Sequence, residues 1–178
     1  MNRLEKRFAA TQRHIEKTQR SHPEFPSDAA LVVRLIKHLY REVQDQTNVV
    51  LRGWSLNHSE FNILMMLYGS ENCAMTPSEL GECTGEKQTN ITRLITQLCE
   101  KNMLSRAPSL DDGRKTLLTM TDSGVATVEE FIPPITRLLN METAGLTALE
   151  QQMLRLLLHK MFAGMALDGE ELADVVEQ

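Results

Sequence analysis

The amino-acid sequence predicts a mainly α-helical fold that carries one small β-hairpin. Aromatic residues make up only 4% of the 178 residues while ten residues are Met, and this composition favours helices over a β-sandwich. Apolar residues recur at helical spacing along most of the chain, and the pattern takes the period of a strand only after Asn102. The length is sufficient for one domain with a substantial core, or for one domain with oligomerisation arms.

Residues 1–26 are predicted to form a basic N-terminal arm. Its six cations outnumber its acids and are Arg3, Lys6, Arg7, Arg13, Lys17 and Arg20. The apolar positions Leu4, Phe8 and Ile15 are too few to bury a helix firmly, so we expect a mobile arm.

A long helix is predicted over residues 27–55, because apolar residues keep helical spacing there. They are Leu31, Val32, Leu35, Ile36, Leu39, Tyr40, Val43, Val50, Leu51 and Trp54. Pro26 interrupts the chain before this helix, and Ser27 with Asp28 is expected to cap its start. Such a stripe is one side of a packed helix, which Gly53 is expected to end.

Residues 56–121 are predicted to hold three helices and the hairpin. Asn57 and Glu60 have the spacing of a capping box, and the helix that they begin is expected to end at Gly69. Residues 73–75 are a candidate for a short strand that pairs with the hairpin.

A strong helix start follows at Thr76, where a hydroxyl cap precedes Pro77 at the first helical position and Glu79 at the third. This short helix is expected to end near Gly85, and another helix to run to about Lys101. Two helices joined by a tight turn form a helix-turn-helix.

The second of these helices has two chemically different faces. The apolar face carries Ile91, Leu94, Ile95 and Leu98. Their spacing places them on one side, where they are expected to pack against other elements. The polar face carries Gln88, Thr89, Asn90, Thr92, Arg93 and Thr96. It suits the major groove of DNA, where Asn and Gln recognise adenine and Arg recognises guanine by paired hydrogen bonds.

After Asn102, which can end a helix in the left-handed conformation, the predicted strands are Met103–Ala107 and Lys115–Met120, joined by a loop over Pro108–Arg114. A hairpin that follows a helix-turn-helix makes a winged helix, whose tip can place Arg114 in a minor groove. The predicted DNA-contacting residues are Thr76, Ser78, Lys87, Gln88, Thr89, Asn90, Thr92, Arg93, Arg106, Arg114 and Lys115.

Residues 122–165 are predicted to form two further helices, and residues 166–178 an acidic tail. The first helix is capped by Thr121 with Asp122 and is expected to bend or break at Pro133-Pro134. Thr147 and Glu150 begin the second helix. Its apolar arc comprises Leu149, Met153, Leu154, Leu156, Leu157, Leu158, Met161 and Phe162. Because so wide an arc needs a second partner, we expect a homodimer whose stem combines both helices with the helix over residues 27–55.

Several of these motifs together resemble the DNA-binding core of MarR-type transcriptional regulators. They are NITRL, the following LCEKNML, the R-x-x-x-x-x-D-x-R pattern that ends at Arg114, and the closing TMTDSG. The stretches SHPEFP and TNITR are most similar to the branch that controls multidrug efflux. The sequence departs from the family pattern at Thr84, Lys87, Ala107 and Gly113, and the last two imply a less basic wing.

The resemblance implies a homodimeric, ligand-responsive regulator, most often a repressor, that binds a pseudo-palindromic double-stranded DNA operator and is released by a small aromatic or phenolic effector. The effector is expected in a crevice between the dimer stem and the winged helix, at Arg34, His38, Trp54, His58, Phe61 and Met65. An ordinary structural role stays open for each of these side chains. Control of efflux is implied by the branch alone, and control of aromatic-acid catabolism stays open.

Composition and missing motifs bear on the other function classes. The net charge is −5, and five acids lie in residues 166–178, so the rest of the chain is neutral and charge alone does not indicate DNA. No apolar run reaches signal or membrane length, so a cytoplasmic protein without membrane contact is expected. Since G-x-S-x-G, H-E-x-x-H and phosphate-loop motifs are missing, neither an enzyme nor a bound cofactor or metal is expected.

The three cysteines, Cys73, Cys83 and Cys99, are predicted to be small, half-buried apolar residues, because they form no C-x-x-C pair and no disulfide or zinc pattern. Two alternatives stay open at this point. One is a regulator that senses oxidants through a cysteine, and the other is a non-catalytic, protein-binding helical module on the same scaffold.

Overall fold

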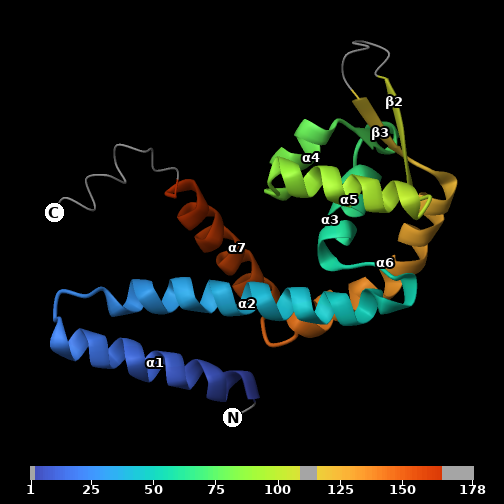
Figure 1. Cartoon of the computed structure of the whole chain (residues 1–178). Coiled ribbons are helices and arrows are strands. Elements are labelled where there is room, and N and C mark those ends of the chain that lie inside the picture. Colours follow the sequence, from blue (N-terminus) through green and yellow to red (C-terminus); the bar gives the residue numbers. More distant parts are fainter. Residues whose placement is uncertain (1–2, 109–115, 166–178) are drawn as a thin grey trace. The chain divides into compact units, whose positions relative to one another are not determined.

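The computed structural model describes residues 3–108 and 116–165 and is mostly helical (Figure 1). Its helices are α1 (Arg3–Ser21), α2 (Ser27–Leu51), α3 (His58–Tyr68), α4 (Pro77–Thr84), α5 (Gln88–Glu100), α6 (Asp122–Glu142) and α7 (Ala148–Ala163), with short 3-10 turns η1 (Arg52–Trp54) and η2 (Glu71–Cys73). The strands are β1 (Ala74–Met75), β2 (Leu104–Pro108) and β3 (Thr116–Met120). The chain divides into two compact units, Met1–Ile135 and Thr136–Gln178. Within the described ranges, no helix has both the length and the apolar content that a membrane span requires.

The three strands form one antiparallel sheet in the order β1-β3-β2. The predicted hairpin is therefore present, with Leu104 opposite Met120 and Pro108 opposite Thr116, and the predicted short strand pairs with its second arm. Leu104, Leu118 and Met120 are buried, so one side of the sheet faces the core. The connection between β2 and β3 lies outside the described residues.

One apolar core holds α5 against the rest of the first unit. The apolar face of α5 is buried as predicted, and the core also takes residues from α2, α3, α4, the sheet and α6. The residues that lose all solvent contact are Leu51, Ile63, Leu64, Leu67, Leu80, Ile91, Leu94, Leu98, Leu118, Val128 and Phe131. Their burial fixes the opposite face of α5 toward solvent.

Local signals in the sequence place the ends of the helices around α5. Thr76 and Asn57 each form a complete capping box, with Glu79 and Glu60 respectively. Gly85, at φ 68°, and Asn102, at φ 55°, adopt the left-handed conformation that ends α4 and follows α5. The predicted Ser27 cap is wrong, because Ser27 is already the first residue of α2 and the preceding Pro26 supplies no capping side chain.

The N-terminal segment is a packed helix, and the expectation of a mobile arm does not describe it. Phe8 packs edge-on against the His38 ring with 5.8 Å between centroids, and Ile15 is only 9% exposed. Arg7 Nη1 donates to Glu42 Oε1 at 2.9 Å. These contacts are few, but they are spread along α1 and pack it against the rest of the first unit. Composition alone does not reveal such contacts.

Close approach of two backbones joins the wing to α6. Thr121 caps α6, since its Oγ1 accepts from the Gly124 N–H at 3.0 Å and donates to the Asn102 carbonyl at 2.7 Å. A Cβ atom added to Gly124 would overlap the Met103 carbonyl oxygen. Only glycine fits there, so the first turn of α6 and the base of the wing are fixed together.

The last two helices depart from the sequence prediction in one respect. Helix α6 runs without a break through Pro133 and Pro134. Buried Phe131 and Ile135 flank the prolines, and their packing offsets the lost backbone hydrogen bonds. Helix α7 begins at the predicted Thr147–Glu150 capping box and has no buried residue.

Candidate nucleic-acid interface

The polar face of α5 is exposed over most of its length. Gln88, Thr89, Thr92, Arg93 and Thr96 are exposed, Asn90 is half-buried, and Lys87 is exposed just before the first turn. No side chain caps α5 among the described residues, so backbone N–H groups of its first turn stay available to an acceptor.

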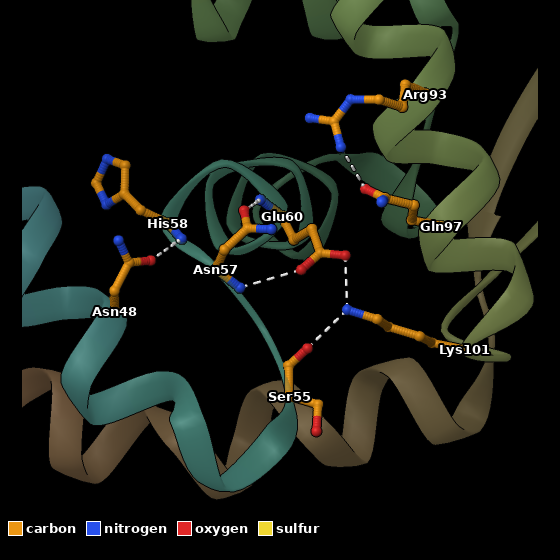
Figure 2. A network of polar contacts seen from close by, with 8 residues as sticks. All are labelled: Asn48, Ser55, Asn57, His58, Glu60, Arg93, Gln97 and Lys101. Carbon is orange, nitrogen blue, oxygen red and sulfur yellow. Dashed lines mark hydrogen bonds and ion pairs between the residues drawn. The ribbon is translucent and has the colours of Figure 1, made fainter.

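The guanidinium of Arg93 is held by two neighbours on its own helix. Its Nε and Nη2 donate to Asn90 Oδ1 at 3.2 and 2.7 Å, and Nη1 donates to Gln97 Oε1 at 2.8 Å. An arginine has five N–H donors, so these three bonds leave two for another acceptor. Figure 2 shows Arg93 and Gln97 joined on the helix. The side chain is thereby oriented before any partner binds.

The threonines of this face present acceptors and methyl groups. Thr92 Oγ1 donates to the Gln88 carbonyl, and Thr96 Oγ1 donates to the Thr92 carbonyl, each at 3.0 Å. Because each hydroxyl proton is used within the helix, the hydroxyl oxygen of Thr92 is left to accept a hydrogen bond, while that of Thr96 already accepts one from Arg106. Such oxygens and methyl groups suit exocyclic amines and the methyl group of thymine.

The remaining predicted DNA contacts lie beside α5 where the structure describes them. Thr76 is engaged in the cap of α4, while Ser78 is exposed in its first turn. Arg106 on β2 donates from Nη2 to Thr96 Oγ1 at 2.7 Å, so the wing is tied to α5. Arg114 and Lys115 lie outside the described residues.

A second polar network fixes the other end of α5 (Figure 2). Lys101 Nζ lies 2.6 Å from Glu60 Oε1 and donates to the Ser55 carbonyl at 2.7 Å. Glu60 Oε2 accepts from the Asn57 N–H at 3.0 Å. The capping-box pattern predicts the bond of Glu60 to Asn57, but sequence reasoning missed its pairing with Lys101.

Sequence reasoning also missed Glu86, in the turn before α5. Its Oε2 accepts from Asn90 Nδ2 at 2.6 Å, and its Oε1 accepts from Ser59 Oγ at 3.1 Å. The spacing of Glu86 and Asn90 at i and i+4 is a signal that could have revealed this pair.

The structure joins only part of the predicted effector-binding set. The His58 and Phe61 rings lie 6.2 Å apart, and Phe131 contacts both Phe61 and Trp54. Met65 packs against the core. His38 instead lies against Phe8, and Arg34 is exposed one turn before it on α2, so these two are not brought to the aromatic cluster. The family resemblance suggested the end of the first long helix and the start of the next as one crevice, but a long helix presents successive residues to different neighbours.

His58 is the titratable group of this cluster. Its Nε2 lies 3.2 Å from Asn62 Nδ2, and its Nδ1 is buried without a hydrogen-bond partner among the described residues. Burial lowers the pKa of His58 below its usual value, and the nearby Glu86 carboxylate opposes that effect.

Trp54 has a structural contact of its own. Its indole N–H donates to Glu130 Oε2 at 3.0 Å.

The cysteines match the prediction in part. Cys73 and Cys99 are half-buried as expected, whereas Cys83 is exposed on α4. The expectation was wrong for Cys83 because this residue falls on the side of a short helix that is not packed on the core.

Comparison with known proteins gives consistent results. The model of the MarR family matches residues 56–116. The transcriptional repressor MprA of Escherichia coli strain K12 is 28% identical over 142 residues, which cover 80% of this chain and 81% of MprA. A crystal structure of a MarR mutant from E. coli complexed with operator DNA has a TM-score of 0.68 and 26% identity, and the match covers 73% of this chain and 92% of that chain.

The fold is also shared with BpsR of Bordetella bronchiseptica, with a TM-score of 0.68 and 24% identity over 77% of this chain and 94% of that chain. The matched segment of the family model spans α3, the helix-turn-helix and the wing as far as the first residue of β3. In its DNA-binding core, residues 56–116, the chain therefore matches the MarR family of winged helix-turn-helix transcriptional regulators, and the relatives it resembles are regulators, not enzymes.

Proposed function

We propose that the protein is a homodimeric, ligand-responsive repressor that binds a pseudo-palindromic DNA operator through α5. The observation that carries the proposal is the outward polar face of α5 over a fully buried apolar face, with Arg93 oriented in advance. A MarR mutant of 26% identity binds operator DNA, which supports the same role for this chain. Gln88, Thr89, Thr92 and Arg93 would contact base edges, while Lys87 and Arg106 would contact phosphates.

Unpartnered apolar surface supports the homodimer. Large apolar side chains are exposed at Leu139, Met141, Leu146, Leu149, Met153, Leu154, Leu156, Leu157, Leu158, Phe162 and Met165. In the other unit, a groove of about 410 Å³ between α1 and α2 is lined by Leu4, Phe8, Leu35 and Leu39. A two-fold dimer that covers such surfaces would present two α5 helices to major grooves one DNA turn, roughly 34 Å, apart.

The aromatic cluster supports a small aromatic or phenolic effector. His58, Phe61 and Tyr40 surround the start of α3, with the His58 ring 6.4 Å from that of Tyr40. In BpsR, DNA binding is regulated by 6-hydroxynicotinic acid. An effector at the start of α3 would favour a spacing of the two α5 helices that does not fit the operator.

The direct test is Arg93→Ala in a gel-shift titration with a labelled promoter fragment from the gene's own locus. Random duplex serves as competitor at physiological salt. We expect operator affinity to fall by about ten-fold or more, because an arginine paired with a base contributes on that order to recognition. The variant should unfold at the wild-type temperature, since Arg93 is exposed.

Arg41→Ala is the matched control, because it removes an exposed arginine from α2. It should leave the titration unchanged. Wild-type operator affinity in the Arg93→Ala variant would refute the role assigned to α5.

A further inference from the structure

The contacts around Asn90 give this residue a different role from base recognition. An asparagine that recognises adenine uses its amide oxygen and nitrogen together. Here Asn90 Nδ2 donates to Glu86 Oε2 at 2.6 Å, while Oδ1 accepts from two nitrogens of Arg93. Both ends of the amide are therefore engaged within the protein, and Asn90 orients Arg93.

Glu86 determines which way the Asn90 amide points. A carboxylate only accepts hydrogen bonds and a guanidinium only donates them. The amide nitrogen must therefore face Glu86, and the amide oxygen must face Arg93. Without the carboxylate, the Asn90 amide loses the partner that holds its nitrogen away from Arg93.

Two other elements hold Glu86 in place. Ser59 Oγ on α3 donates to its carboxylate Oε1 at 3.1 Å, and the Glu86 backbone N–H donates to Thr84 Oγ1 on α4 at 3.4 Å. Glu86 is half-buried and lies at the N-terminal end of α5, where a negative charge is stabilised by the helix dipole. Because its other oxygen is held by Ser59, the Glu86 carboxylate is a positioned acceptor for Asn90 in the first turn of α5.

We propose that Glu86 is a specificity-determining positioning residue, which fixes Asn90 and thereby the direction of the two remaining Arg93 donors. This inference rests on the proposed function, since it assigns to Glu86 the accuracy of operator recognition. The carboxylate also repels phosphates, so it lowers affinity for any DNA while it raises discrimination between sequences. A merely structural residue would not lower affinity for all DNA while it raises discrimination between sequences, so these two effects identify the role of Glu86.

Two substitutions separate the geometry of Glu86 from its charge. Glu86→Gln can still accept from Asn90 through its amide oxygen and donate to Ser59 through its amide nitrogen, so it keeps the geometry without the charge. Glu86→Asp keeps the charge, but its side chain is one methylene shorter, so the acceptor is withdrawn from Asn90. Glu82→Ala is the matched control, because it removes an exposed carboxylate from neighbouring α4.

The measurement is the ratio of affinities for the promoter fragment and for random duplex of the same length. We expect Glu86→Ala and Glu86→Asp to lower this ratio by about ten-fold, the order contributed by one correctly oriented side chain. Glu86→Gln should keep the wild-type ratio while its affinity for random duplex rises, and Glu82→Ala should behave like Glu86→Gln. Thermal unfolding of each variant shows whether it is folded.

A double-mutant cycle tests whether Glu86 acts through Asn90. Asn90→Ala should lower the ratio as far as Glu86→Ala does, and the double variant should lower it no further. A wild-type affinity ratio in both Glu86→Ala and Glu86→Asp would overturn the proposal. So would a loss in Glu86→Gln equal to that in Glu86→Ala. A double variant in which the losses of Glu86→Ala and Asn90→Ala multiply would overturn it as well, because the two residues would then act independently. A wild-type protein that does not distinguish the promoter from random duplex would instead overturn the proposed function, and this inference with it.

Discussion

At the scale of single residues, His58 connects the start of α3 to the turn before α5. Its ring packs against both the Tyr40 and the Phe61 rings, and the Glu86 carboxylate acts on it electrostatically. Burial is the larger effect and lowers the pKa of His58, so the imidazole is neutral near pH 7. A neutral imidazole packed against aromatic rings is a suitable contact for a flat aromatic effector.

The lowered pKa of His58 predicts that acid destabilises the fold. Below the unfolded-state pKa of about 6.5, the unfolded chain binds a proton at this residue while the folded chain does not. The free energy of unfolding should therefore fall as the pH decreases from about 6.5 toward the lower folded-state pKa, and then level off. Urea denaturation at pH 7.5 and at lower pH, compared between wild type and His58→Gln, measures this contribution.

His22→Gln is the matched control for that comparison, because His22 is an exposed histidine. The part of the pH dependence that belongs to His58 should disappear only in His58→Gln. An identical pH dependence in wild type and His58→Gln would contradict the assignment.

At the scale of elements, α5 is tied to the start of α3 near both of its ends. Glu86 meets Ser59 before α5 begins, and Lys101 meets Glu60 where it ends. The Glu60 side chain is 2% exposed and that of Lys101 is 30% exposed, so the second pair is an ion pair with one partner buried. A displacement of α3 by an effector would therefore be transmitted to α5 at two points.

Lys101→Met is expected to destabilise the first unit by about 3 kcal/mol, because it leaves a buried carboxylate without its charged partner. Urea denaturation measures the change, and Lys17→Met, at an exposed lysine of α1, is the matched control. Replacing both partners, as in Glu60→Gln with Lys101→Met, should recover part of the loss, since no buried charge then remains unpaired. Wild-type stability in the single variant would contradict a structural role for the pair.

The elements also show how much of the fold and the site follows from sequence. The capping boxes at Asn57, Thr76 and Thr147 and the left-handed Gly85 depend on neighbours within a few residues, so local spacing predicts them. Partners distant in the chain depend on packing, and spacing does not predict them. Lys101 and Glu60 are 41 residues apart, and the contact of Phe8 with His38 joins two helices whose docking depends on complementary shape.

The same distinction applies to the candidate interface. The periodic pattern predicts which face of α5 is polar, and the structure agrees. It does not predict that Asn90 is engaged by Glu86 and Arg93, because hydrogen-bond partners are chosen by side-chain geometry. The sequence also placed His38 and His58 in one effector-binding set. In the structure, His38 packs against Phe8 and His58 packs against Tyr40.

At the scale of the whole molecule, the apolar surface of α7 is the feature that a single chain leaves unexplained. All of its large apolar residues except the half-buried Met161 are exposed, including Leu149, Leu156 and Phe162. Exposed apolar surface on this scale marks an interaction site, and the proposed two-fold dimer would cover it. Operator binding would then depend on two α5 helices held by one stem.

Leu157→Glu tests that dependence, because it places a charge in the apolar arc of α7 at a side chain that is 59% exposed in one chain. Burying an unpaired charge in an interface is costly, so analytical ultracentrifugation should find a monomer at concentrations where wild type is a dimer. Loss of the second half-site contact should lower operator affinity by about 100-fold or more. Gln152→Glu adds the same charge elsewhere on α7 and should leave both measurements unchanged. A Leu157→Glu variant that stays dimeric, or that binds operator as a monomer with wild-type affinity, would exclude a stem built on this face.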